Sequence, residues 1–424
     1  MSTSDKAAST DEQHLDGKLD RMAAGLIAEP TGAPTFSEAD GRWLVTRHDD
    51  VCQVLLDPVS FSNDIVRRPG KLHRRVLEVL LTGRPFNTPI AASDPPSHAR
   101  RRKLLNAVFT TPRMTALEPQ LGHILDEMVG RIEALAQVDL WSEFCVWVPM
   151  RVFGLMLGAD METLIAVRAW RRDWIRLAWY GIEVDDQVEC ARSVVAMQRH
   201  FMSLVEARRM DPRDDILSAL VHASASAEDP FSDDELLAEL FGLMEAGQET
   251  TSAAIANAVY YLLADRAQWT ALCADPALAV NAVEEVLRRD SAIRGLLRTV
   301  TRDVEVGGVV IPAGAGVRVM LAAGGDRPTS GPIEITNPQS GRHLAFGRGI
   351  HYCIGAALAR TQIRMALETL ARRLPSLRLR AGAQYEYVGN PAFRIPVGLP
   401  VEWDTDDKTS SIHQHTNNGE VRSC

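Results

Sequence analysis

The sequence predicts a mainly α-helical protein with a minor β-sheet. Helical periodicity of the apolar residues dominates the chain after residue 94, and strand-like alternation is confined to a few short runs. The longest periodic run, residues 233–263, would extend about 45 Å as a helix, because each helical residue adds about 1.5 Å. Such a helix could cross the whole molecule.

The predicted elements follow one another along the chain. Residues 42–46 alternate as a strand, and residues 305–311 do so with Gly307 and Gly308 as a bend. Long amphipathic runs predict helices at residues 118–135, 186–209, 233–263 and 354–374. Ser232 stands before the third of these helices as its expected N-cap.

Size and composition limit the possible functions. The chain has 424 residues, of which 46% are hydrophobic, so it can bury a large core, and length alone suggests two or three domains. No Pro/Gly/Ser-rich linker divides residues 15–404. A net charge of −9 argues against a nucleic-acid partner. The six cysteines show no CxxC pair or zinc spacing, which fits a reducing cytoplasm.

The two ends of the chain carry little chemistry. Residues 1–14 are polar and are predicted to be flexible, with neither a signal peptide nor a membrane anchor. The longest apolar stretch, residues 144–158, is interrupted by Pro149 and Arg151 and is too short to span a bilayer. We therefore expect a cytoplasmic protein without membrane contact. Residues 405–424 are predicted to be a disordered tail, in which His413 and His415 are most simply solvated.

One glycine-rich segment, residues 346–355, places a cysteine directly before a helical sequence. Gly347 and Gly349 can adopt backbone angles closed to other residues and bring the main chain close to a flat cofactor. Cys353 stands at the predicted helix start, where partial positive charge favours an anionic sulfur. A buried structural cysteine is the alternative. The spacing of six fixed positions, one Phe, three Gly, one His and one Cys, favours a thiolate presented to a metal.

The segment resembles the haem-ligand signature of the cytochrome P-450 superfamily, Phe-Gly-x-Gly-x-His-x-Cys-x-Gly, and residues 356–360 continue the match. The resemblance implies one haem domain over residues 15–404, with the long helix lying over haem b. It makes Cys353 the axial iron ligand, with Phe346, Gly347 and Ala246 beside the cofactor. A thiolate ligand favours O–O cleavage and thus oxidative chemistry.

Residues 246–251 match the family's oxygen-activation motif, Ala-Gly-x-Asp/Glu-Thr, within the long helix. The small residues Ala246 and Gly247 would let the backbone approach the haem and open a local bulge. Glu249 could relay protons inward, and the Thr250 hydroxyl could donate a hydrogen bond to dioxygen. An ordinary helix with a surface Glu and a buried Thr is the alternative.

The resemblance also implies a cradle for the two haem propionates. Residues 94–102 resemble the pattern Asp-Pro-Pro-x-His-x-x-x-Arg, which places His98 and Arg102 on one helix face. Together with Arg298 and His351 they would bind the carboxylates, since arginine is always charged. Each of them alone is more simply a solvated basic residue.

A second family pattern, Glu-x-x-Arg, is matched by Glu285 and Arg288 and implies a structural ion pair behind the haem. Residues 324–341 depart from the family, lacking its Asn-Arg-Asp-Pro opening and its later pairing of an aromatic residue with Arg. The third partner of the Glu285 and Arg288 network is therefore open.

Aromatic residues occur on the segments expected to line the substrate pocket. Trp170 and Trp174 lie four residues apart and share a helix face. The two rings either form an aromatic wall of the substrate pocket or pack one helix against another. The arginines of the same helix are most simply its solvated face. The aromatic residues on these segments are Phe86, Trp170, Trp174, Trp179, Tyr180 and Phe393.

The resulting prediction is a bacterial-type haem-thiolate monooxygenase of secondary metabolism. Its partners would be dioxygen, a small organic substrate, and a ferredoxin or flavodoxin with its reductase. An aromatic, indole or cyclic-peptide substrate is the expectation. Oxidative C–C or C–N coupling by the same oxidant is one alternative, and a non-catalytic haem-thiolate sensor is another. The basic residues expected to dock the electron donor are Arg100, Arg101, Lys103, Arg348 and Arg364.

Overall fold

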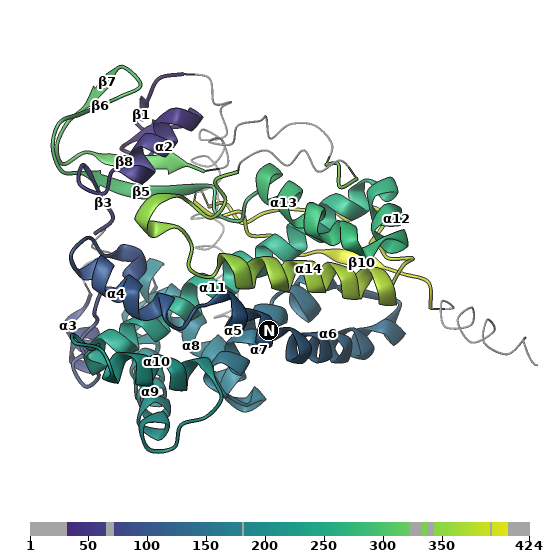
Figure 1. Ribbon diagram of the computed structural model, residues 1–424, viewed down its shortest axis with the longest axis horizontal. Helices are drawn as coiled ribbons and strands as arrows, with labels where there is room; N and C mark the ends of the chain where they lie inside the picture. The colour runs from purple at the N-terminus through teal and green to yellow at the C-terminus, as the bar shows by residue number, and fades with distance from the viewer. Residues whose placement is uncertain are drawn as a thin grey trace, which may run out of the picture.

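The computed structural model describes residues 32–64, 72–179, 182–321, 333–336, 343–390 and 392–405. Helices fill most of this structure, and the strands β1, β2, β3, β5 and β8 gather with α2 at one end (Figure 1). The mainly α-helical class with a minor sheet is confirmed.

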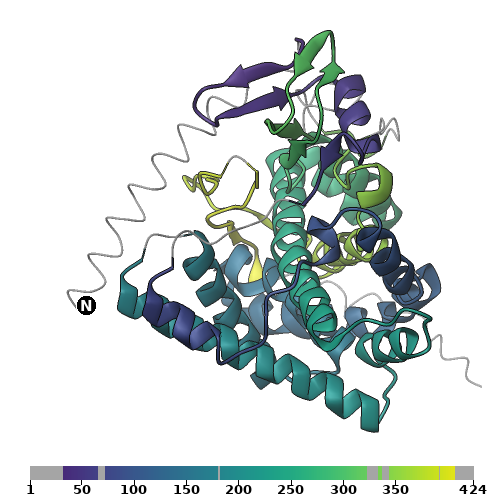
Figure 2. The same ribbon diagram turned by 90° about the vertical axis from the view of Figure 1, so that its left-hand side faces the viewer.

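The helices surround α11, which runs through the middle of the molecule (Figure 2). In chain order they are α2 (His48–Leu56), α3 (Arg74–Leu80), α4 (Ser97–Asn106), α5 (Thr111–Ala116), α6 (Glu118–Ile132), α7 (Trp147–Leu157), α8 (Met161–Trp179), α9 (Val184–Met210), α10 (Ile216–Ala225), α11 (Asp233–Ala264), α12 (Arg266–Ala274), α13 (Ala279–Arg289) and α14 (Ala356–Arg373).

In the described part of the chain, the strands form three small sheets. The largest has the order β1-β2-β8-β5-β3, in which β2 and β8 run parallel with Trp43 opposite Val317. A second sheet joins β4, β10 and β9, and β6 pairs with β7 as a hairpin. The bounds are β1 Thr35–Ser37, β2 Arg42–Val45, β3 Phe61–Ser62, β4 Gln137–Asp139, β5 Gly295–Val300, β6 Val304–Val306, β7 Val309–Ile311, β8 Gly316–Met320, β9 Arg378–Leu379 and β10 Pro400–Glu402.

Helix α11 begins and packs as its sequence predicts. The Ser232 hydroxyl accepts a hydrogen bond from the Glu235 N–H at 3.2 Å, and the Glu235 carboxylate accepts one from the Ser232 N–H at 2.9 Å. This capping box satisfies two backbone donors that no helical carbonyl can reach. Further along, the buried residues include many alanines, which allow α7, α13 and α14 to pack closely against α11.

The other predicted elements agree with the structure to within a few residues. The run 118–135 ends as α-helix at Ile132 and continues as one 3-10 turn, and the run 354–374 begins as α-helix only at Ala356. The predicted strand 305–311 is the β6–β7 hairpin, with Gly307 and Gly308 at positive φ in its turn.

Residues 1–14 and 406–424, including His413 and His415, lie outside the described residues, so flexible ends stay a prediction. Within the described ranges, no single helix has the length and apolarity to cross a bilayer. Residues 141–157 and 161–177 reach that length and composition only as a pair, which is bent by 116°.

Candidate functional site

The cysteine loop is a tight, hydrogen-bonded turn between residue 343 and α14. The Cys353 N–H donates to the Phe346 carbonyl at 3.0 Å, which closes the loop across Gly347 and Gly349. Both glycines have positive φ, +68° and +75°. A Cβ at Gly349 would also collide with the Leu55 carbonyl oxygen. The structure thus gives the loop the backbone shape that its glycines predict.

Burial is the largest influence on the pKa of Cys353 in the protein alone. It raises the pKa of the thiol, while the Gly355 N–H and the charges of Arg102 and Arg360 act in the opposite direction. The backbone N–H at the start of α14 therefore favours the anionic sulfur, as the sequence predicts, while desolvation acts against it and is the larger effect in the protein alone. A coordinated metal cation would displace the proton outright.

Two of the four predicted propionate ligands, Arg298 and His351, contact Asn63, which the sequence did not single out, and His98 packs against His351. Arg298 Nη1 donates to Asn63 Oδ1 at 2.5 Å, and Asn63 Nδ2 lies 3.4 Å from His351 Nδ1. The rings of His98 and His351 meet edge to face at 4.3 Å. The cluster joins β3, α4, β5 and the cysteine loop.

This cluster has unused capacity for an anion. The Nε2 atoms of His98 and His351 are buried and have no hydrogen-bond partner. Burial, together with the charges of nearby cations, lowers the pKa of His351 to about 3 and also lowers that of His98. Burial lowers the pKa of Arg298 to about 10. Carboxylates placed here would pair with a desolvated guanidinium and two unpartnered imidazoles, so the residues fit the propionates of a haem.

Arg102, the fourth predicted ligand, belongs to the same region. Its Nη1 donates to the Tyr352 carbonyl at 2.7 Å, and its Nε donates to Asn106 Oδ1 at 3.0 Å. Its charge acts on both His98 and Cys353. Arg102 therefore links α4 directly to the cysteine loop.

The acid and alcohol of the long helix lie on an unbroken stretch of α11. The Thr250 hydroxyl donates to the Ala246 carbonyl at 2.7 Å. The local bulge predicted at Ala246 and Gly247 is wrong, because α11 is continuous from Asp233 to Ala264. An added Cβ at Gly247 would meet nothing within 4 Å, so this stretch of the helix leaves room for a flat group.

Glu249 is held by a residue that the sequence had assigned to a solvated face. Arg171 Nη2 lies 2.6 Å from Glu249 Oε2, and the Arg171 side chain is only 15% exposed. The pair joins α8 to α11. Placing Arg171 on the solvated face was wrong, because this guanidinium turns inward to a carboxylate 78 residues away.

The predicted Glu285 and Arg288 pair forms within α13. Arg288 Nε and Nη2 donate to the two carboxylate oxygens at 2.9 and 2.6 Å, and both residues are buried. The pairing is bidentate, the strongest geometry for these groups. Most of the divergent segment 324–341 lies outside the described residues.

Three of the aromatic residues on the expected pocket segments, Phe86, Trp170 and Trp174, pack against other rings. Trp174 stacks on Phe86 with ring centres 5.4 Å apart, and it meets Phe241 edge to face at 5.0 Å. Trp170 lies beside His200 at 5.4 Å. The Trp179 side chain and Tyr180 lie outside the described residues. Phe86 remains 49% exposed, so one ring of this set is available to a ligand.

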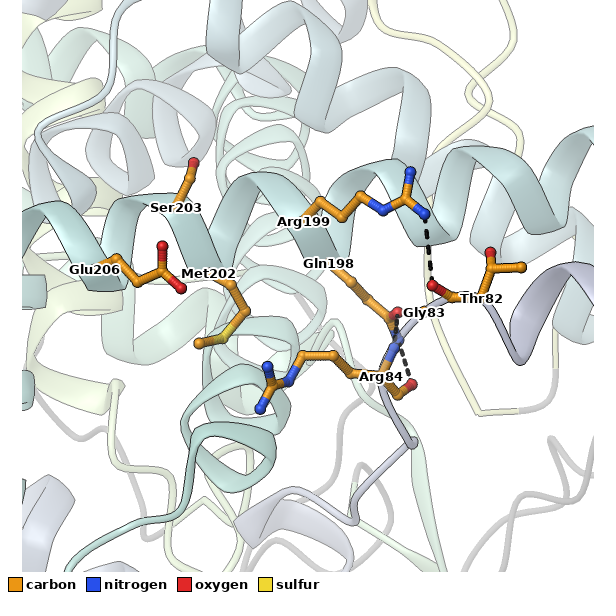
Figure 3. A pocket seen from close by; sticks show the side chains of 8 residues that line it. All are labelled: Thr82, Gly83, Arg84, Gln198, Arg199, Met202, Ser203 and Glu206. Atoms are coloured by element: carbon orange, nitrogen blue, oxygen red, sulfur yellow. Dashed lines mark hydrogen bonds between the residues drawn. The ribbon is translucent and has the colours of Figure 1, made fainter.

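A separate depression of about 280 Å³ lies between α9 and the segment after α3 (Figure 3). Arg199 Nη2 donates to the Thr82 carbonyl there, and Gln198 exchanges hydrogen bonds with the Arg84 backbone. None of the predicted site residues lines it.

Two residues of the predicted docking face do not belong to it. Arg101 is 3% exposed and pairs with Glu239 at 2.7 Å, and Arg100 pairs with Glu235. Both turn toward α11. Lys103 and Arg348 are exposed, and Arg364 pairs with Glu118 and Glu368. The docking prediction now rests on Lys103 and Arg348.

Comparisons with known proteins agree with this geometry. The family model described as Cytochrome P-450 matches residues 184–272 and 277–375. Cytochrome P-450 107B1 of Saccharopolyspora erythraea is 37% identical, over 80% of this chain and 83% of the relative. Nocardicin C N-oxygenase of Nocardia uniformis is 34% identical, over 85% and 89%. The solved P-450 heme domain of Tepidiphilus thermophilus superposes with a TM-score of 0.81 at 29% identity, covering 88% of this chain and 92% of that one.

Proposed function

Since this chain belongs to the cytochrome P-450 family and is an oxidoreductase of that family, we propose that it is a monooxygenase that holds haem b through Cys353. The observation that carries the cofactor assignment is the cluster of His98, His351 and Arg298 around Asn63. It offers unpartnered imidazole nitrogens and a desolvated guanidinium beside the cysteine loop.

A bound haem would supply the oxidising chemistry of a monooxygenase, in which one atom of dioxygen enters the substrate and the other leaves as water, with two electrons and two protons consumed. Phe346 and Gly347 shape the turn that presents the Cys353 sulfur. Arg298 would pair its charge with a propionate carboxylate, and the neutral imidazoles of His98 and His351 would donate hydrogen bonds to it. Ala246 and Gly247 leave space along α11 for the flat ring.

Protons reach the site through the acid and alcohol of α11. Glu249 is 33% exposed on its side chain and is tied to Arg171, so it can exchange protons with solvent and deliver them inward. The single Thr250 hydroxyl proton is donated to the Ala246 carbonyl in this structure, so Thr250 can pass a proton to dioxygen only when its hydroxyl turns away from that carbonyl. Thr250 is the group that hands protons to dioxygen.

Turnover with a surrogate ferredoxin and its reductase tests this function. In isotopically labelled dioxygen, a monooxygenase product gains one labelled oxygen atom. Consumption of substrate and electrons without label in the product would instead indicate oxidative coupling. Haem-thiolate spectra without any substrate-dependent electron use would indicate a sensor.

The substrate class we propose is an aromatic natural product, such as an indole or a cyclic peptide. Support comes from the exposed Phe86 ring beside Trp174. Aromatic rings bind planar ligands by offset or edge-to-face contact.

Phe86 and Trp174 should respond differently to replacement by alanine. Phe86→Ala should stay folded and bind aromatic ligands about 2- to 10-fold more weakly, because one ring contact of roughly 0.5 to 1.5 kcal/mol is lost. Trp174→Ala should cost roughly 3 kcal/mol of stability, because two ring contacts vanish and leave a cavity. Spectral titration and thermal unfolding measure these effects. If Phe86→Ala weakens the binding of terpenoid and fatty-acid ligands as much as that of aromatic ligands, the aromatic assignment is contradicted.

An acidic ferredoxin is the proposed electron donor, docking at Lys103 and Arg348. Lys103→Glu should slow reduction by the ferredoxin several-fold at low salt, and the difference should vanish as salt rises, because exposed charges are screened beyond about 10 Å at 0.1 M. Stopped-flow reduction across a salt series measures this. Arg192→Glu, which makes the same charge reversal at an exposed position on α9, is the matched control. A rate for Lys103→Glu that equals the wild-type rate at low salt would refute the docking site.

A further inference from the structure

One carboxylate on α13 contacts residues on both sides of Cys353. Arg360 Nε lies 2.6 Å from Glu284 Oε1, and its Nη2 lies 3.1 Å from Oε2. His343 Nε2 lies 3.1 Å from the same Oε2. His343 precedes the cysteine loop, and Arg360 stands in the first turns of α14, which follows it.

The histidine is oriented by a second hydrogen bond. Its Nδ1 accepts from the Ala345 N–H at 3.2 Å, so the proton of the neutral ring is on Nε2, which donates to Glu284. The His343 side chain is 8% exposed. This contact fixes the backbone at the beginning of the loop.

The arginine fixes the other side. Its guanidinium lies over the Phe346 ring, 4.4 Å from the centre, and its Nη1 donates to the Tyr352 hydroxyl at 3.4 Å. Phe346 in turn accepts the Cys353 N–H through its carbonyl. Glu284, Arg360 and Phe346 thus form a chain of contacts that ends at the cysteine backbone.

The charges of the chain also act on the sulfur. Burial alone would raise the pKa of Glu284, but hydrogen bonds from His343 and Arg360 lower it to about 2, so this carboxylate is ionised. Arg360 is one of two cations whose charge acts on Cys353, the other being Arg102. Because the carboxylate lies against Arg360, it offsets part of the positive charge near the sulfur.

The neighbouring Glu285 does not share this role. Its carboxylate is engaged by Arg288 in the bidentate pair within α13. Adjacent residues of a helix point in directions about 100° apart, so the two acids serve different contacts. The sequence singled out Glu285 and passed over Glu284.

We propose that Glu284 is a positioning residue for the haem-thiolate site: it holds both sides of the Cys353 loop together and sets the positive charge felt by the Cys353 sulfur. This inference rests on the proposed function, since it concerns how the loop presents its thiolate to iron.

Three variants separate the effect of the Glu284 charge from the effect of the Glu284 side-chain shape. Glu284→Gln keeps the size and the acceptor oxygen but removes the negative charge, so the reduction potential of the iron should shift to more positive values. Arg360→Gln removes the positive charge and should shift it to more negative values. In the double variant the shifts should largely cancel. Glu368→Gln, which removes one charge from the Arg364 pair on the same helix, is the control and should leave the potential unchanged.

The positioning role has its own readout. Glu284→Ala should lose the red-shifted carbonyl band of the thiolate form several-fold faster than the wild type during incubation in mild denaturant, whereas Glu284→Gln should lose it less quickly. If Glu284→Gln does not fold, the proposal is tested by the direction in which Arg360→Gln shifts the reduction potential. A shift to more negative values supports it, and a shift to more positive values contradicts it. Shifts of the same sign in the two single variants, or none, would overturn the proposal. Absence of a thiolate band in the wild type would instead refute the proposed function.

Discussion

Replacing Thr250 with alanine should leave the fold and haem binding intact while diverting most electrons to hydrogen peroxide. Alanine is a better helix former than threonine, and the only hydrogen bond lost within α11 is that from the hydroxyl to the Ala246 carbonyl. The hydroxyl that passes protons to dioxygen is gone, so product formation per electron should fall roughly a hundredfold, a typical loss for one positioned proton donor. Simultaneous assay of product, peroxide and reductant consumption measures it.

Two further variants define the proton route. Thr250→Ser keeps the hydroxyl and should stay largely coupled. Glu249→Gln should slow oxygen activation without raising peroxide to the same extent, because the amide fills the carboxylate's place beside Arg171 but carries no exchangeable acid proton. Full coupling in both Thr250→Ala and Glu249→Gln would rule out the relay.

Replacing Arg298 with methionine should cause the largest loss of haem. Arg298 is 5% exposed, and its Nη1 donates to Asn63 Oδ1 and to the Leu297 carbonyl. Removing one partner of a buried ion pair costs roughly 3 to 5 kcal/mol, which corresponds to haem loss about a hundred- to several-thousandfold faster. Transfer of haem to a globin acceptor measures the rate.

A surface arginine from the same part of the sheet provides the control. Arg302 follows β5 and donates to the Ser60 hydroxyl at 3.0 Å, so Arg302→Met should retain haem like the wild type. If Arg298→Met loses haem no faster than the wild type, Arg298 does not bind a haem propionate.

The sequence predicted those features that depend on local pattern. Ser232 and the acidic turn after it were enough to place the start of α11, and the glycines around Cys353 were enough to predict a turn with positive φ. The positions of His98, Arg298 and His351 followed only from the family resemblance, and the structure brings them together.

What the sequence missed depends on contacts between distant segments. Asn63 meets Arg298 across 235 positions, and Arg171 meets Glu249 across 78, so no local period indicates either contact. The error at Arg100 and Arg101 was avoidable. Consecutive helical residues point about 100° apart, so a run of basic residues cannot form one basic face.

Replacement of Cys353 by histidine tests the central claim most directly, since the account makes the Cys353 sulfur the ligand of the haem iron. The reduced carbonyl complex of the wild-type protein should show the strongly red-shifted absorption of a thiolate-ligated haem. Cys353→His should still bind haem through the unchanged cradle of His98, Arg298 and His351, but without that shift. A red-shifted band that persists in Cys353→His, or one that is absent from the wild type, would contradict the account.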